Sequence, residues 1–140
     1  MHLSLAVRDL AESRAFYVDV LGCELGRVRD GWIDVWFFGM QVTLHEEPDL
    51  VMPPDARGVR HFGVTLAADQ LDALLRRLES QPTDQPIDQP IDQPIEWLRP
   101  VTTEHAGTPR AQTKAMIVDP SGNAIELKTY ADPAAAFADG

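Results

Sequence analysis

The sequence predicts an α+β fold made of two similar halves, and three observations carry this prediction. Two segments of like pattern open with a histidine, at His2 and His61. Each begins an alternation of apolar and polar residues, which is typical of a strand with one face on a core. An amphipathic stretch with helical spacing follows in both cases, and further alternating segments come after it. Strands and helices therefore recur in the same order.

The first half covers about residues 1–48. Its expected elements are a strand at His2–Val7, a helix at Leu10–Leu21, and strands at Trp32–Phe37 and Gln41–His45. Asp9 or Ser13 is expected to cap the helix, and Gly22 to end it. Leu3, Leu5 and their counterparts on the later strands are expected to face the core.

The second half covers about residues 59–130 and repeats this plan. Its expected elements are a strand at His61–Leu66, a helix at Asp69–Ser80, a strand around Trp97, and a hairpin of Ala111–Val118 and Asn123–Thr129. A proline-rich connector at 49–58 joins the halves. Proline recurs every fourth residue within 81–95, which excludes a helix or a central strand, so we expect an extended insertion there. Residues 1–140 are expected to form a single domain.

The composition excludes some classes of partner. Asp and Glu number 22 against 12 Lys and Arg, which disfavours nucleic acid and anionic membranes. No apolar run approaches the roughly 18 residues of a membrane helix, and no signal peptide is expected. Cys23 is the single cysteine, which indicates a reducing compartment and a cytoplasmic location.

Comparison of the halves predicts a metal site. When the two final strands are aligned, Thr43 falls at the position of Glu126. The chain then has two equivalent histidines, His2 and His61, and one carboxylate, Glu126. Two imidazoles and a carboxylate form a facial triad that leaves open positions on a divalent ion such as Fe, Mn, Ni, Co or Zn. An unpaired Glu126 on an otherwise apolar strand would be costly without a cation.

The residues that share a strand face with these ligands are small or polar. They are Ser4, Gln41, Thr43, Gly63 and Thr65. A closed apolar core would not select such residues. They fit a curved mixed sheet whose convex face carries the helices and whose concave face lines a cup for a small molecule.

Other residues of that face are candidates for substrate contacts. Trp32, Asp34 and Trp36 are expected to stack a planar ligand or to pack against the neighbouring half. Lys114, which shares its face with Met116, would balance an anionic substrate or lie solvated at a sheet edge.

A catalytic base is not identified by the pattern. His45 is a candidate base, an alternative ligand or a residue of the cup's rim. Ser4 is a second candidate base, and so is a water molecule.

Three segments resemble the vicinal oxygen chelate superfamily, which includes glyoxalase I, fosfomycin-resistance proteins, bleomycin-resistance proteins and extradiol dioxygenases. They are His2–Leu10 with Ser13–Gly22, then Gly58–Val64, and Asp119–Leu127. The resemblance implies two βαβββ modules joined into a cup, with metal ligands at His2, His61 and Glu126. It also implies a homodimer, because relatives often dimerise and some build each site from both chains.

The branches of this superfamily differ at individual positions. The intact triad differs from bleomycin-resistance proteins, which bind drug without a protein-held metal. Thr43 or Gln41 stands where glyoxalase I usually has a fourth ligand. Met116 replaces the tyrosine of fosfomycin-resistance proteins and of extradiol dioxygenases.

Two function classes follow, with a third resting on the insertion. The first is a metal-dependent enzyme, a dioxygenase or a lyase or isomerase, that chelates two oxygens of a small substrate and polarises it. The alternative is a binding protein that sequesters a small molecule or antibiotic without turnover. The third is an adaptor that uses the proline repeat.

Overall fold

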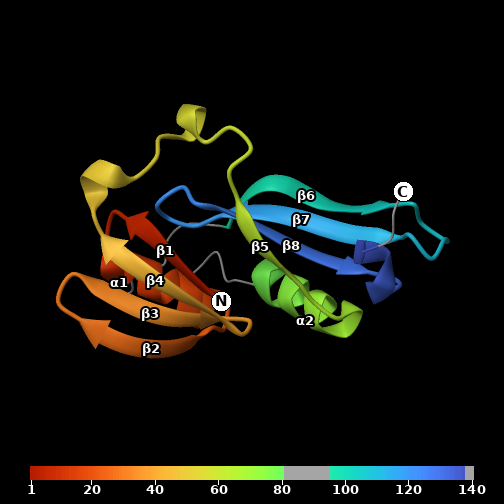
Figure 1. The fold of residues 1–140 in the computed structure, drawn as a ribbon, viewed down its shortest axis with the longest axis horizontal. Coiled ribbons are helices and arrows are strands. Elements are labelled where there is room, and N and C mark those ends of the chain that lie inside the picture. The colour runs from red at the N-terminus through yellow and green to blue at the C-terminus, as the bar shows by residue number, and fades with distance from the viewer. Residues whose placement is uncertain (81–94, 138–140) are drawn as a thin grey trace.

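The chain folds into two four-stranded mixed sheets, which lie side by side in Figure 1. The structure is a computed structural model that describes residues 1–80 and 95–137. The first sheet has the order β1-β4-β3-β2, with β1 His2–Val7, β2 Glu24–Arg29, β3 Trp32–Phe37 and β4 Met40–Glu46. The second has the order β5-β8-β7-β6, with β5 Phe62–Thr65, β6 Glu96–Glu104, β7 Gln112–Val118 and β8 Ala124–Tyr130.

The strand pairing confirms the predicted α+β class and its internal repeat. In each sheet the module's first strand runs parallel to its last, and the remaining neighbours are antiparallel. Ser4 pairs with Thr43 in the first sheet, and Gly63 pairs with Glu126 in the second. Thr43 and Glu126 therefore occupy equivalent positions, as the aligned halves predict.

The first predicted helix has two parts. Helix α1, Leu10–Arg14, begins at Asp9, whose carboxylate accepts the amide N–H of Glu12. A π-helix, Ala15–Val20, then continues it, and the Leu21 N–H bonds to the Phe16 carbonyl at 2.9 Å. The predicted span of 10–21 is thus right in extent, but its second half has the wider π turn.

The second helix agrees with the prediction to within one residue. Helix α2 is Ala68–Glu79, and its leucine stripe at 71, 74, 75 and 78 is buried. Arg77 of α2 donates to the carbonyl oxygens of Val20 and Asp19, at 2.8 Å each, so α2 packs against the end of the π-helix. No helix within the described ranges is long and apolar enough to cross a membrane.

The connector passes over the ends of the two sheets (Figure 1). It carries two 3-10 turns, Pro48–Leu50 and Pro54–Ala56, and a further one, Pro133–Phe137, follows β8. The expected extended insertion falls almost entirely on residues 81–94, which lie outside the described part of the chain.

Two edge strands differ from the sequence prediction. β2 was not predicted, and β6 is a nine-residue strand where only a strand around Trp97 was expected. Both lack clean alternation because register shifts interrupt their pairing with β3 and β7. The strand predicted from His61 begins one residue later, at Phe62.

One apolar cluster joins the modules. It combines Val7, Tyr17, Val35 and Leu44 of the first module with Leu71, Ile117 and Leu127 of the second, among others. The Phe37 and Phe62 rings meet at 5.3 Å between centroids, which ties β3 to β5. Cys23 is buried, and its burial raises the pKa of the thiol to about 12.

A buried carboxylate also joins the modules. Asp119 opens the β7–β8 turn, and the Tyr17 hydroxyl donates to it at 3.0 Å. Asp119 also accepts the backbone N–H groups of Ser121 and Asn123 and the Asn123 side-chain amide. Burial is the dominant effect on this carboxyl and raises its pKa, although these hydrogen bonds act in the opposite direction.

Candidate functional site

The residues of interest lie on the face of each sheet opposite the core. In the second sheet Glu126 is the central residue of that face, with its side chain 16% exposed. Its carboxylate oxygen Oε2 lies 2.6 Å from Lys128 Nζ and 3.9 Å from His61 Nε2. Glu126 is therefore not unpaired, in contrast to the expectation from sequence, because Lys128 already supplies a cation.

The His61 ring is oriented by its own backbone. His61 Nδ1 lies 2.8 Å from the carbonyl oxygen of Val59. A carbonyl oxygen only accepts, so Nδ1 carries the proton and donates it. In the neutral ring, Nε2 then presents a lone pair toward Glu126. A ring nitrogen held in this way by a carbonyl is a common arrangement for a metal-binding histidine.

Gly63 permits the approach that brings His61 to Glu126. A Cβ atom at Gly63 would lie 2.2 Å from the Glu126 carbonyl oxygen and 3.0 Å from its Cβ. No side chain fits there without displacing β5 from β8. The glycine therefore holds the two strands close, and the histidine two residues before it lies beside the carboxylate.

The donors present fit a divalent ion. An imidazole nitrogen, in the neutral form of the ring, and a carboxylate oxygen face each other here, and such a pair is a typical partial donor set for Zn, Fe, Mn or Co. Two donors bound to one ion at about 2.1 Å each lie roughly 3.0–3.5 Å apart. The observed 3.9 Å needs only a small side-chain movement, together with release of Glu126 by Lys128.

The equivalent face of the first sheet carries His2. Its Nε2 lies 3.1 Å from the Ser4 hydroxyl. His2 pairs in register with Gln41, and Ser4 with Thr43. No group of three or more His, Cys, Asp and Glu side chains that would hold an ion is present among residues 1–80 and 95–137. One chain thus brings His61 and Glu126 together but does not add His2 to them.

In the first sheet the carboxylate on this face belongs to a closed polar network. Asp34 is 2% exposed, and its carboxylate accepts the Thr43 hydroxyl at 2.6 Å and Arg27 Nε at 2.7 Å. Burial alone would raise the pKa of Asp34, but the hydrogen bonds from Thr43, Arg27 and Gln41 together lower it. Asp34 is therefore an internal carboxylate held by its neighbours.

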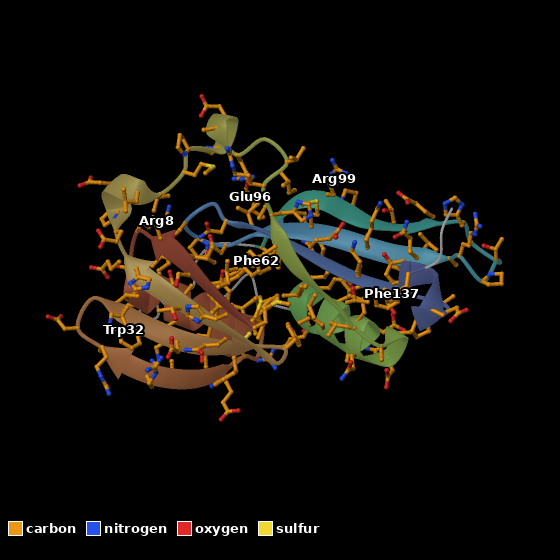
Figure 2. All side chains as sticks on the ribbon, in the orientation of Figure 1. Arg8, Trp32, Phe62, Glu96, Arg99 and Phe137 are labelled. Atoms are coloured by element: carbon orange, nitrogen blue, oxygen red, sulfur yellow. The ribbon has the colours of Figure 1, made fainter. Side chains whose placement is uncertain are left out.

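The aromatic candidates lie along the same face. Arg27 also covers the Trp32 ring, at 5.2 Å from its centroid, and Trp32 contacts the His45 ring at 6.4 Å. Trp32 is half-buried, whereas Trp36 is 45% exposed. Figure 2 shows Trp32 on the first sheet, away from the second module.

Lys114 and Met116 lie beside Glu126 and Lys128 on the second sheet. Met116 pairs with Glu126, and Lys114 with Lys128. Met116 is buried, and Lys114 forms an ion pair with Glu104 at 2.7 Å. The two neighbouring lysines are each balanced by a separate carboxylate.

Three residues of this surface were missed by sequence reasoning. Lys128 follows Glu126 by two positions, so strand periodicity was a sufficient signal. Glu104 lies on an exposed edge strand with no such signal. Arg27 reaches Asp34 at the register shift between β2 and β3, which alternation does not reveal.

Comparison with known proteins agrees with this architecture. The profile of the Glyoxalase/Bleomycin resistance protein/Dioxygenase superfamily matches residues 1–127. A crystal structure of a glyoxalase/bleomycin resistance protein/dioxygenase from Alicyclobacillus acidocaldarius is 28% identical, covers 93% of this chain and 89% of that one, and has a TM-score of 0.74.

Two further relatives extend the comparison. The genomically encoded fosfomycin resistance protein FosX from Listeria monocytogenes has a TM-score of 0.67 over 92% of this chain and 90% of its own, and at 15% identity it shows the fold alone. The uncharacterized Escherichia coli protein YaeR is 33% identical over 89 residues, which are 56% of this chain and 67% of YaeR. With two mixed sheets in this arrangement and a profile match over most of its length, the chain belongs to the Glyoxalase/Bleomycin resistance protein/Dioxygenase superfamily.

Proposed function

We propose that this chain is a metal-dependent enzyme acting on a small anionic substrate, in which His61 and Glu126 of one chain and His2 of a second copy hold the ion. The observation that carries the proposal is the His61–Glu126 pair, with Nε2 facing the carboxylate and Nδ1 held by Val59. The superfamily commonly uses divalent metals and binds small molecules, which supports the same assignment.

The second copy follows from the position of His2. Its equivalence to His61 places it on the matching face of the other module, yet one chain does not bring the three side chains together. A homodimer in which the first module of one chain covers the second module of its partner would complete the triad. Ser4, Gln41 and Thr43 would then line the same enclosed space as Glu126.

The chemistry would be polarisation of two substrate oxygens, which the bound ion supplies as a Lewis acid. Lys114 and Lys128 would bind an anionic group of the substrate in exchange for their present carboxylate partners, which the side they share with Glu126 supports. Trp32 and Trp36 would contact its planar part. His45 and Ser4 are the candidate bases, and the reaction belongs to the dioxygenase or to the lyase and isomerase type. The expected cytoplasmic location stays a prediction.

A mixing experiment tests both the ligands and the sharing of the site. His2→Ala and Glu126→Gln are prepared separately, each expected to lose most of its bound metal, and then combined so that subunits exchange. In a mixed dimer both substitutions fall in one site, and the other site keeps all three ligands. Metal content by elemental analysis should therefore recover toward one ion per mixed dimer. His105→Ala, in an exposed loop, is the matched control and should keep full metal.

Each outcome of this experiment has a definite meaning. Full metal in Glu126→Gln would overturn the site itself. Loss in both variants without recovery on mixing, when subunit exchange is verified by native mass spectrometry, would overturn the sharing between chains and leave the ligands standing.

One observation favours the alternative of a binding protein without turnover. Lys128 already neutralises Glu126 at 2.6 Å, so the folded chain needs no ion for charge balance. On that alternative, a small aromatic ligand should quench tryptophan fluorescence equally well with and without a chelator. Binding that disappears with chelator would exclude the binding-protein alternative.

The adaptor hypothesis rests on residues 81–94, outside the described ranges.

A further inference from the structure

A cavity of about 330 Å³ lies beneath the connector, away from the candidate metal ligands. Its lining comes from the connector, the end of β1, the π-helix, the start of β6 and the β7–β8 turn. Arg8, Phe16, Met52, Arg57, Glu96 and Gly122 are among the residues that line it. Figure 2 shows Arg8 and Glu96 on the side of the molecule that the connector crosses. A volume of this size accepts a small organic molecule.

Arg57 brings a positive charge to the wall of this cavity. Its Nε atom is buried and has no hydrogen-bond partner among the residues that the structure describes. Because this atom is closed to water, other atoms of the Arg57 side chain line the cavity, and a ligand there would meet the positive charge of the guanidinium. Arg57 also forms no ion pair with Glu96 or Asp119 in the described part of the chain, although both line the same cavity.

The β7–β8 turn places Arg57 at the wall. Gly122 has φ +89°, and a Cβ atom there would lie 3.5 Å from Arg57 Nη2 and 3.8 Å from the Met52 carbonyl oxygen. The turn backbone at Gly122 therefore lies beside the guanidinium of Arg57.

The remaining lining residues determine the charge and the shape of a ligand that would fit. Arg8 adds a second guanidinium, and its ion pair with Glu12 leaves it 46% exposed. Asp119 is occupied by the hydrogen bonds of the turn, and Glu96 is exposed at the start of β6. Apart from Ser121, the other walls are apolar, with Phe16, Met52, Ile95, Val118 and the prolines of the connector among them.

We propose that this cavity is a second small-molecule site, which binds a monocarboxylate with a short apolar body. The carboxylate lies between Arg57 and Arg8, where a guanidinium offers paired N–H donors to two oxygens. The apolar body packs on Phe16, Met52 and the prolines. None of His2, His61 and Glu126 lines the cavity, so the inference does not depend on the proposed metal site.

Calorimetric titration with hexanoate tests this site on the full chain. Hexanoate should bind saturably, and Arg57→Gln should weaken binding by about tenfold, because a charge-assisted hydrogen bond is lost. Arg29→Gln, at an exposed arginine of β2, is the matched control and should bind as the unchanged protein does. Hexan-1-ol, which has the same body without the charge, should bind at least about tenfold more weakly.

Folding of the variants is checked by circular dichroism, and a second variant strengthens the test. Glu96→Gln removes a negative charge from the lining and should tighten hexanoate binding. No saturable binding of hexanoate, equal binding by Arg57→Gln, or equal binding of hexan-1-ol would each overturn the proposal. Unchanged hexanoate binding after treatment with chelator is expected, which keeps this result separate from the fate of the metal site.

Discussion

The two modules share one plan but differ at its centre. At equivalent positions the first module has Thr43 and the second has Glu126. The first module keeps a carboxylate nearby, Asp34, which is buried and held by Thr43 and Arg27. The second leaves its carboxylate partly exposed, beside a histidine nitrogen. The repeat therefore produced one closed polar network and one open donor pair, and the open pair is where ion chemistry is expected.

The last turn of each module also differs, in its length and in its contacts with the other module. The β3–β4 turn consists of Phe38 and Gly39, both at positive φ, and Phe38 is 39% exposed. The β7–β8 turn is longer, and its Asp119 is bonded to Tyr17 of the first module. One turn only reverses the chain, whereas the other fastens the modules together.

Removal of the Asp119 carboxylate should have the largest effect. Asp119→Ala leaves the buried Tyr17 hydroxyl and the amides of Ser121 and Asn123 without their acceptor. We expect the free energy of unfolding to fall by about 3–4 kcal/mol, since each unsatisfied buried group costs roughly 1–3 kcal/mol and neighbouring losses are not additive. Urea denaturation measures it. Phe38→Ala, in the other turn, should stay within about 1 kcal/mol, and similar losses in both variants would contradict the contrast.

Making the first module resemble the second should be the next largest change. Thr43→Glu places a carboxylate against buried Asp34 and removes the hydroxyl that donates to it. We expect a loss of about 2–3 kcal/mol from like-charge repulsion and burial. The same substitution in an Asp34→Asn background should cost clearly less.

Denaturation of the two single variants and the double variant checks this coupling. Thr43→Val separates the loss of the hydroxyl from the added charge, and we expect it to cost about 1 kcal/mol. A Thr43→Glu protein as stable as the unchanged one would show that the first module tolerates a second carboxylate.

The fold was predictable where one face of an element is buried. The alternation in β1, β3, β4, β7 and β8 reflects a core on one side, and the leucine stripe of α2 does the same. The edge strand β2 escaped prediction, and β6 was predicted only around Trp97, because register shifts break their periodicity and solvent contacts both faces. The π-helix escaped because its apolar spacing does not differ visibly from that of an α-helix over six residues.

For the candidate site, the sequence proposed donor residues, whose role stays a prediction, but it did not indicate their counter-charges. The internal repeat was enough to single out His61 and Glu126, which the structure places 3.9 Å apart. Arg27 contacts Asp34 from a stretch of β2 where the register with β3 shifts. Such contacts are set by tertiary geometry, which a linear pattern does not carry.

Removal of Lys128 sharpens the difference between the two carboxylates. Lys128→Met takes away the ammonium that competes with an ion for Glu126, so divalent metal should bind about three- to tenfold more tightly. Lys114→Met is the matched control, because that lysine pairs with Glu104. A competition titration against a metal indicator measures both variants. Weaker binding in Lys128→Met than in Lys114→Met would mean that Lys128 supports the site.

The smallest expected effect concerns stability at acid pH. Acidification should change the contributions of Asp34 and Asp119 to the free energy of unfolding in opposite directions. The folded state lowers the pKa of Asp34, so its contribution to stability is present above the usual aspartate pKa and is lost as the pH falls through the lowered value. The folded state raises the pKa of Asp119, so its contribution is present at acid pH and is lost as the pH rises through the raised value.

Urea denaturation across the acid range separates these two contributions. The Asp34→Asn variant should lose less stability on acidification than the unchanged protein, because it lacks the carboxylate whose charged form the fold stabilises. Asp119→Asn should lose more, because it no longer gains from protonation. If stability depended on pH in the same way in Asp34→Asn as in the unchanged protein, Thr43 and Arg27 would not be lowering the pKa of Asp34, and the closed network of the first module would not favour its charged form.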